Sequence, residues 1–200
     1  MDDLDQEMIK DINNEENSPI NTNEENSNKT EKKKSNFFTE WILPVALAFI
    51  IALLIKQFLI FKVYIPSGSM IPTLNKGDHL FVSRVYNLDN IKRGDILVFY
   101  SEELNETLIK RLIGLPGDEI SIVDGKVSVN GEEINEDYVK NKDQFYGDFK
   151  VPEGKYFFLG DNRPISLDSR KWNNPYIDGK DIKAKAQLKV YPFSDFGSIK

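Results

Sequence analysis

The sequence predicts a mostly β fold, with an N-terminal transmembrane helix followed by an antiparallel, partly closed β domain. Two observations carry this prediction. A long apolar run without charges extends from Trp41 to Ile55. Beyond Val63, short runs of β-branched and aromatic residues recur, and Asp-Gly or Asn-Gly pairs separate some of them. Such pairs accept the positive φ angles of tight hairpin turns, so they indicate antiparallel neighbours.

Residues 1–36 predict a disordered, cytoplasmic tail that is acidic and rich in Asn. Residues 1–28 hold nine acidic side chains and seven asparagines against one lysine, so little apolar surface is present to bury. A lysine cluster then follows at Lys29, Lys32, Lys33 and Lys34. The formal net charge of -6 comes largely from the tail, because residues 63–200 hold 19 basic and 21 acidic side chains. No basic patch indicates nucleic acid as a partner.

Residues 37–61 predict a retained transmembrane anchor. The charge-free run is flanked by further apolar residues up to Phe61, and about 20 apolar residues suffice to cross a bilayer as a helix. Two alternatives are weaker. A cleavable signal peptide has a much shorter polar segment before its apolar run, and a buried core helix has a polar face, which this run lacks.

The orientation of the anchor follows from the lysines around it. The cluster Lys29–Lys34 precedes the apolar run, whereas only Lys56 and Lys62 lie at its far edge. Basic residues remain on the cytoplasmic side, so we expect a single-pass protein of the cell membrane with a cytoplasmic N-terminus. Residues 62–200 would then form an extracytoplasmic catalytic β domain.

Strands are expected at 79–82, 95–100, 119–123, 126–129, 155–159 and 182–191. Asp124-Gly125 and Asn130-Gly131 stand between or after alternating runs and predict type I′ hairpins. Residues 135–154 are polar and rich in Asp, Lys and Gly, which predicts a surface excursion.

Ser69 is the first candidate for chemistry. It lies in Pro66-Ser67-Gly68-Ser69-Met70, a Gly-containing turn that can expose a hydroxyl just beyond the apolar run. A serine needs a base to become a nucleophile. The chain has no Cys and one His, which excludes disulfides, thiolate catalysis and a His-rich metal site. We therefore expect no metal and no cofactor.

The base is expected to be Lys110 rather than His79. His79 follows a polar turn, Lys76-Gly77-Asp78, where a histidine is more often a surface or strand-start residue. Lys110 stands in Leu108-Ile109-Lys110-Arg111-Leu112, among apolar residues that could lower the pKa of its amine. A strand lysine whose ammonium reaches solvent remains the alternative from this stretch alone.

A third cluster of polar side chains follows the apolar strand at 155–159. It runs from Gly160 to Arg170 and contains Asp161, Arg163, Ser166, Asp168 and Arg170. Alone it is typical of a surface turn or a cation-binding loop. Beside a Ser–Lys pair, Ser166 could orient the lysine amine and the ionic side chains could hold the loop in place.

These stretches, together with Arg93-Gly94-Asp95-Ile96-Leu97, resemble the boxes of the bacterial type I signal peptidase family in order and spacing. The single N-terminal apolar run resembles the Gram-positive form. The resemblance implies that Ser69 is the nucleophile, Lys110 the general base, and Ser67 an oxyanion-hole donor beside the Ser69 backbone N–H. Ser166 would hydrogen-bond Lys110. Structural support would come from Asp161, Arg163, Asp168, Arg170 and Arg111, and also from Met70, Pro72 and Gly94.

The function implied by the resemblance is a membrane-anchored serine endopeptidase that removes N-terminal signal peptides from secreted preproteins. It would cut after small residues at positions -3 and -1. Its expected partners are signal-peptide-bearing preproteins, the lipid bilayer and the secretion translocon. Two alternatives remain. Self-cleaving Ser–Lys repressors are soluble and bind DNA, and a membrane-tethered β module with an inert Ser69 would act as a chaperone or assembly factor.

Overall fold

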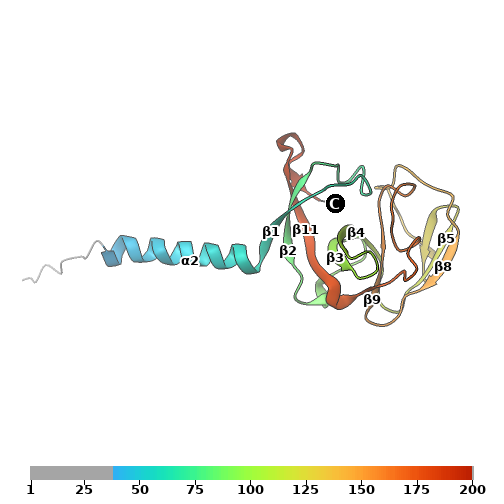
Figure 1. The fold of residues 1–200 in the computed structure, drawn as a ribbon, viewed down its shortest axis with the longest axis horizontal. Coiled ribbons are helices and arrows are strands. Elements are labelled where there is room, and N and C mark those ends of the chain that lie inside the picture. The colour runs from blue at the N-terminus through green and yellow to red at the C-terminus, as the bar shows by residue number, and fades with distance from the viewer. Residues whose placement is uncertain (1–37, 200) are drawn as a thin grey trace, which may run out of the picture. The chain divides into compact units, whose positions relative to one another are not determined.

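The computed structural model describes residues 38–199 of the chain. The predicted acidic tail over residues 1–36 therefore lies outside the described residues. By its internal contacts the chain divides into two units, Met1–Leu43 and Pro44–Lys200. All of the β structure belongs to the second unit, whose strands are drawn from cyan to red in Figure 1.

The helical part begins with a short π-helix, Phe38–Ile42, and continues as α2, Leu43–Phe58. Apolar residues that are not branched at Cβ, such as Ala46, Leu47 and Leu53, favour the helix, and Pro44 is tolerated in its first turn. Between residues 38 and 199, none of the helices has both the length and the apolar character needed to cross a bilayer. The anchor predicted over residues 37–61 is therefore not confirmed and stays a prediction.

A large antiparallel sheet forms most of the β domain (Figure 1). Its strands follow the order β1-β2-β11-β3-β4-β9-β10, and β12 pairs with β11. The bounds of these strands are β1 Ile60–Tyr64, β2 His79–Arg84, β3 Ile96–Ser101, β4 Glu106–Gly114, β9 Lys155–Leu159, β10 Ile177–Asp178, β11 Ile182–Tyr191 and β12 Gly197–Ser198. Short 3-10 turns lie at Leu88–Asn90, Gly179–Asp181 and Phe193–Asp195. The predicted mostly β, antiparallel architecture is confirmed.

A second sheet has the strand order β7-β6-β5-β8. Its strands are β5 Glu119–Val123, β6 Lys126–Val129, β7 Glu132–Glu133 and β8 Gly147–Lys150. Both predicted hairpins are confirmed. Asp124 and Gly125 have φ angles of 52° and 74°, and Asn130 and Gly131 have φ angles of 53° and 86°. These left-handed conformations turn the chain tightly enough to pair β5 with β6 and β6 with β7.

The strand β1 overlaps the end of the predicted anchor. Ile60 and Phe61 were assigned to the end of the anchor, but they pair with Ser83 and Val82 of β2. An apolar run does not reveal where a helix ends and a buried strand begins, because both present the same residue types. The partner strand, which lies further along the chain, decides the boundary.

Candidate active site

The turn that carries Ser69 connects β1 to β2 and is anchored in the core by apolar side chains of its own. Ile65, Met70 and Leu74 are all at most 1% exposed and belong to one core cluster. The Leu74 N–H donates to the Met70 carbonyl at 2.9 Å, which closes the turn. Because neighbours on both sides are buried, Ser69 itself is only 7% exposed and its position is well defined.

Lys110 reaches Ser69 from the middle of β4. It lies opposite Leu97 of β3, and its side chain is enclosed so that the residue is 4% exposed. The distance from Lys110 Nζ to Ser69 Oγ is 2.6 Å, across 41 positions of sequence. The two residues that sequence reasoning paired are therefore in hydrogen-bond contact.

The pKa of the Lys110 amine is lowered from 10.5 to about 8. Burial is the main cause, because it removes the water that stabilises an ammonium ion. The negative charges of Asp168 and Asp161 act in the opposite direction and limit the fall. A substantial fraction of the amine is thus neutral near pH 8, and a neutral amine can accept the proton of the Ser69 hydroxyl.

Ser67 adds a second hydroxyl at the same point. Its Oγ lies 3.3 Å from Ser69 Oγ, and either hydroxyl can be the donor. Ser67 is exposed, in contrast to Ser69. A hydroxyl in this position can rotate toward a group that approaches Ser69 from solvent.

A groove of about 420 Å³ opens beside the pair. One wall is β1 and the residues after it, and the other is the first half of β4; its lining is Val63, Tyr64, Ile65, Pro66, Ser67, Val98, Glu106, Thr107, Leu108, Ile109 and Lys110. In the described part of the chain, β1 pairs only with β2, and residues 106–110 pair only with β3. Each wall therefore presents a strand edge that no other strand occupies.

The loop from Gly160 to Arg170 lies on the other side of the pair and is joined to β4 by an ion pair. Arg111 donates from Nε and Nη2 to the two carboxylate oxygens of Asp161, at 2.9 and 2.7 Å. Both side chains are at most 3% exposed. Arg111 also donates to the carbonyl of Gly94 at 2.8 Å, and the Thr73 hydroxyl donates to Asp161. The bidentate contact between Arg111 and Asp161 fixes the loop against the strand that bears Lys110.

Two further arginines are buried within the loop, and each has a carboxylate partner from residues 136–143, a segment that we call the strap. Arg163 donates to both oxygens of Glu136, at 3.1 and 2.5 Å. Arg170 binds Asp168 in the loop and donates to Asp143 of the strap at 2.6 Å. Asp168 also accepts from the Gly160 N–H at 3.0 Å. The predicted supporting residues are therefore close together and paired.

Ser166 does not make the hydrogen bond that the resemblance implied. Its Oγ is fully buried, and it has no hydrogen-bond partner among the described residues. It nevertheless lies close to the nucleophile, because both residues pack against Gly160. A Cβ on Gly160 would stand 2.2 Å from Ser166 Oγ and 2.6 Å from the Ser69 carbonyl oxygen. Gly160 is thus required for the close approach of loop and turn.

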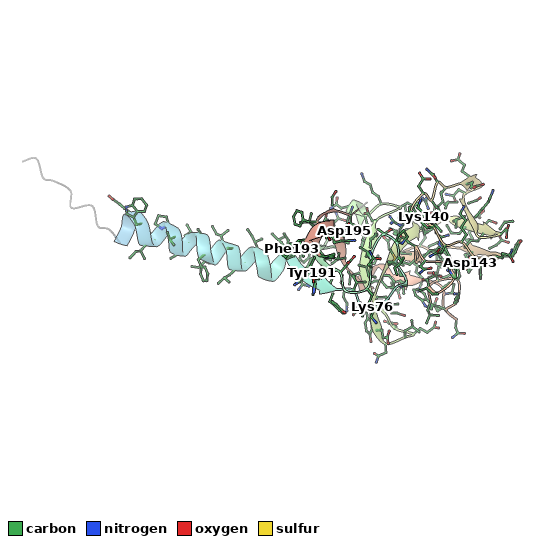
Figure 2. All side chains as sticks on the ribbon, turned by 90° about the horizontal axis from the view of Figure 1, so that it is seen from above. Lys76, Lys140, Asp143, Tyr191, Phe193 and Asp195 are labelled. Atoms are coloured by element: carbon green, nitrogen blue, oxygen red, sulfur yellow. The ribbon has the colours of Figure 1, made fainter. Side chains whose placement is uncertain are left out.

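His79 lies elsewhere, at the start of β2. Its ring packs between Tyr64 and Tyr191, with ring centroids 5.4 and 5.5 Å apart. It is paired with Tyr64 in the sheet and is part of an aromatic row at the surface. Tyr191 and Phe193 of this row lie well away from Lys140 and Asp143 of the strap (Figure 2).

Sequence reasoning missed the strap. The prediction of a surface excursion over residues 135–154 is wrong for Val139 and Val151, which are 6% and 1% exposed, and for Glu136, whose side chain is 8% exposed. It also overlooked Asn162, which is 8% exposed and touches the Ser69 turn. A carboxylate in a polar stretch of sequence does not indicate that its side chain is buried. The three arginines of the boxes could have indicated further carboxylate partners, because a buried guanidinium group needs a negative partner.

No group of three or more His, Cys, Asp or Glu side chains within residues 38–199 has the arrangement of a metal site.

Comparison with known proteins identifies the family. Residues 38–191 match the family model of signal peptidase, peptidase S26. The chain belongs to this family. A signal peptidase I from Bacillus licheniformis is 41% identical over 84% of this chain and 95% of that protein. Signal peptidase I T from Bacillus subtilis is 37% identical over 90% of this chain and 100% of that protein. The predicted bacterial type I signal peptidase, and hence a peptidase enzyme, is confirmed.

A solved structure of a signal peptidase I from Enterococcus faecalis is 33% identical and covers 50% of this chain and 98% of that chain, with a TM-score of 0.42. This score is too low to support a comparison of the two folds. The family assignment therefore rests on the sequence matches.

Proposed function

We propose that the chain is a membrane-anchored serine endopeptidase that removes N-terminal signal peptides from secreted preproteins and cuts after small residues at positions -3 and -1. In this proposal Ser69 is the nucleophile and Lys110 the general base. One observation carries the mechanism: a buried amine with a pKa near 8 stands 2.6 Å from a buried hydroxyl. Membership of the signal peptidase family supports signal-peptide-bearing preproteins as substrates.

The first half of the reaction is acylation of Ser69. The neutral Lys110 amine takes the hydroxyl proton while Ser69 Oγ bonds to the carbonyl carbon of the scissile peptide. The resulting ammonium then transfers that proton to the nitrogen of the leaving chain, and the C–N bond breaks. Deacylation repeats these steps with water in place of Ser69, and Lys110 again serves as base. A base with a pKa close to the working pH is effective in both directions.

The oxyanion formed in each half needs donors that are already in place. The Ser67 hydroxyl, 3.3 Å from Ser69 Oγ, can turn toward it, and the Ser69 backbone N–H is the second donor. Donors of this type are worth on the order of 10²–10³ in rate each. Ser67 is exposed before substrate arrives, and bound substrate would shield it from water.

The substrate would bind as an extended strand in the groove. Its backbone can pair with the free edges of β1 and of residues 106–110, which are two walls of the same cavity. In an extended chain, residues at -1 and -3 point to the same side. The buried side chains of Ile65 and Val98 lie in the groove lining, and this supports a preference for small residues at both positions.

The remaining residues have supporting roles in this proposal. Arg111, Asp161, Arg163, Asp168 and Arg170 hold the loop against β4, and Ser166 supports the loop beside the Ser69 turn. An anchor that ends before β1 would keep the enzyme at the cell membrane, with the N-terminus in the cytoplasm and the β domain outside. Its support is the apolar run, whose side chains stay exposed on all sides, for example Leu47 at 54% and Phe49 at 64%. The bilayer and the translocon would then be neighbours of the site.

The test is cleavage of a preprotein by the full chain in detergent. A preprotein with Ala at -3 and -1 should be cut once, after the -1 residue, and mass spectrometry of the product gives the bond. Leu at -1 or -3 should stop cleavage. The same chain with Ser69→Ala should leave the preprotein intact. Cleavage at the same bond by the Ser69→Ala variant would refute the proposed nucleophile.

A further inference from the structure

Asn162 holds the backbone on both sides of the Ser69 α-carbon. Its backbone N–H donates to the Ser69 carbonyl oxygen at 3.0 Å. Its side-chain Nδ2 donates to the carbonyl oxygen of Gly68 at 3.2 Å. Asn162 is itself 8% exposed, so water competes little for these contacts. A single loop residue therefore tethers two consecutive peptide groups of the nucleophile turn.

The Gly68 tether bears directly on the Ser69 N–H. The Gly68 carbonyl and the Ser69 N–H belong to one peptide group, which is trans. In a planar trans peptide the C=O and the N–H point in opposite directions. A hydrogen bond that draws the Gly68 carbonyl toward Asn162 therefore turns the Ser69 N–H to the opposite side. The Ile71 N–H also donates to the Gly68 carbonyl at 3.2 Å, so Asn162 is the second of two donors that hold this peptide plane. Glycine restricts the rotation of such a plane less than any other residue, which makes a second donor effective.

Asn141 and the Gly68 carbonyl favour the same orientation of the Asn162 amide. Asn141 Nδ2 donates to Asn162 Oδ1 at 3.2 Å. A side-chain amide has one oxygen acceptor and one NH₂ donor. With its oxygen bound to Asn141, Asn162 presents its NH₂ to Gly68. If the amide were flipped, two donors would meet at Asn141 and two acceptors would meet at Gly68. The Gly68 carbonyl can only accept, and the donor from Asn141 reinforces the amide orientation that this carbonyl requires.

We propose that Asn162 is a positioning residue that aims the Ser69 backbone N–H at the oxyanion, and that Asn141 sets its amide for this purpose. The inference rests on the proposed Ser69 mechanism and deepens it. Neither asparagine touches substrate. Each acts through the Gly68–Ser69 peptide, so the effect should appear where charge develops on the carbonyl oxygen and not in substrate binding.

Steady-state kinetics of the full chain in detergent give the first test. Asn162→Asp keeps the backbone bond to Ser69 but places a carboxylate against the Gly68 carbonyl, so kcat should fall about 10- to 100-fold with KM unchanged. Asn141→Ala should lower kcat about 3- to 10-fold. The double variant Asn141→Ala/Asn162→Ala should be no slower than Asn162→Ala alone, because Asn141 acts only through Asn162. Multiplied effects would contradict this relay.

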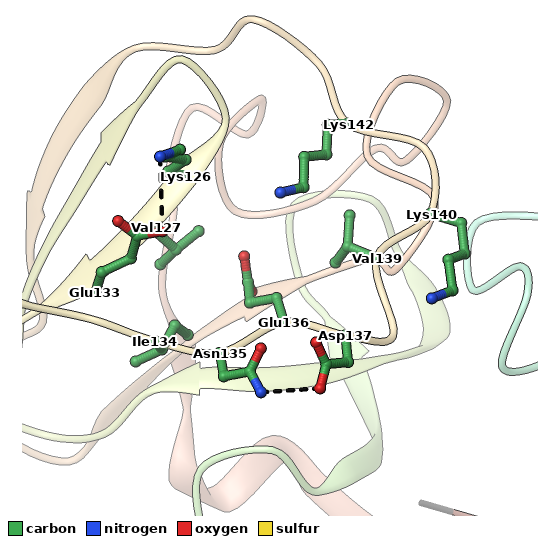
Figure 3. A pocket seen from close by; sticks show the side chains of 10 residues that line it. All are labelled: Lys126, Val127, Glu133, Ile134, Asn135, Glu136, Asp137, Val139, Lys140 and Lys142. Carbon is green, nitrogen blue, oxygen red and sulfur yellow. Dashed lines mark hydrogen bonds and ion pairs between the residues drawn. The ribbon is translucent and has the colours of Figure 1, made fainter.

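Asn135→Ala is the matched control. Asn135 belongs to the same polar stretch, but its Nδ2 donates to Asp137 at 2.9 Å and not to Asn162 (Figure 3). This variant should keep the wild-type kcat. A comparable loss of kcat in the control would mean that any disturbance of this polar stretch lowers activity through packing, and it would overturn the assignment to Asn141.

A peptide aldehyde gives the second test, because it forms a tetrahedral adduct. Ser69 Oγ bonds to the aldehyde carbon, the carbonyl oxygen becomes the adduct oxygen, and the hydroxyl proton passes to Lys110. For a peptide aldehyde with Ala at -3 and -1, Asn162→Asp should weaken binding about 10- to 100-fold, in step with kcat/KM. The matching peptide alcohol, which cannot form the adduct, should bind as before. Equal losses for both peptides would overturn the inference.

Different results would refute the Ser69 mechanism and the positioning role of Asn162. If Ser69→Ala still cleaves the preprotein, the mechanism itself is refuted whatever the asparagine variants do. If Ser69→Ala is inactive while Asn162→Asp retains the wild-type kcat, the nucleophile stands and only the positioning role is refuted.

Discussion

The two sides of the Ser69–Lys110 pair differ in their chemistry. On one side lies the groove, whose walls are strand edges and largely apolar side chains such as Ile65, Val98 and Ile109. On the other side three buried arginines, one on β4 and two in the loop from Gly160 to Arg170, each meet at least one carboxylate of the loop or the strap. The apolar surroundings lower the pKa of the amine, whereas the ionic side holds the turn and the strand in register.

This arrangement explains how Lys110 can act as a base although the guanidinium groups of three arginines are buried in the same domain. Unpaired guanidinium groups would repel a proton on Lys110 and lower its pKa well below the working range. Their partners Asp161 and Asp168 instead raise that pKa and oppose the larger effect of burial, so that it stays at about 8. Each of the three arginines is thus neutralised by at least one carboxylate, and burial is the largest cause of the shift in the Lys110 pKa.

The largest expected effect comes from removing the pair itself. Lys110→Ala and Ser69→Ala should each lower the rate of preprotein cleavage by about 10⁴-fold or more, because one removes the proposed base and the other the proposed nucleophile. His79→Ala is the control and should keep the wild-type rate, since its ring contacts only Tyr64 and Tyr191 among the aromatic neighbours. Substantial activity in Lys110→Ala would mean that the groove side does not supply the base.

Ser67→Ala tests the edge of the groove and should have the next largest effect. It removes a hydroxyl 3.3 Å from Ser69 Oγ, and we expect kcat to fall about 10²- to 10³-fold with little change in KM. Ser128→Ala, on β6 of the second sheet, is the matched control. A purely KM effect would show that Ser67 binds substrate and does not stabilise the oxyanion.

Gly160→Ala tests the junction between the two sides. The new methyl group would stand 2.2 Å from Ser166 Oγ and 2.6 Å from the Ser69 carbonyl oxygen, so the turn must shift. We expect activity to fall about 10- to 100-fold and the free energy of unfolding to drop by about 1–3 kcal/mol. Gly197→Ala, where nothing lies within 4 Å of the added Cβ, should change neither quantity. Normal kinetics in Gly160→Ala would show that the loop need not approach Ser69.

The pH dependence of kcat/KM tests whether burial on the groove side sets the pKa of Lys110. Since the pKa of Lys110 is lowered to about 8, the amine is mainly protonated and inactive below that pH and mainly neutral above it. The value of kcat/KM should therefore rise about tenfold per pH unit below pH 8 and level off above it. A profile that is flat between pH 6 and pH 10, measured on one preprotein at constant ionic strength, would contradict the assignment of Lys110 as base.

Local features of the fold were predictable because they depend on adjacent residues. The hairpin at Asp124-Gly125 follows from the positive φ angles that these two residues tolerate, and the strands at 119–123 and 126–129 follow from their alternation. The limits of β1 were not predictable, since Ile60 joins a strand only because Ser83 lies opposite it. The strap was not predictable either, because Glu136 meets Arg163 across 27 positions.

Which groups are available follows from the order of residues alone: one histidine, no cysteine, a serine in a Gly-containing turn, a lysine among apolar residues, and the four boxes in family order. Only the tertiary structure decided which of these groups meet. The contact between Lys110 and Ser69 spans 41 positions, and the Arg111–Asp161 pair spans 50. The lowered pKa belongs to the structure as well, because desolvation is a property of the space around the amine and that space is formed by strands distant in the chain.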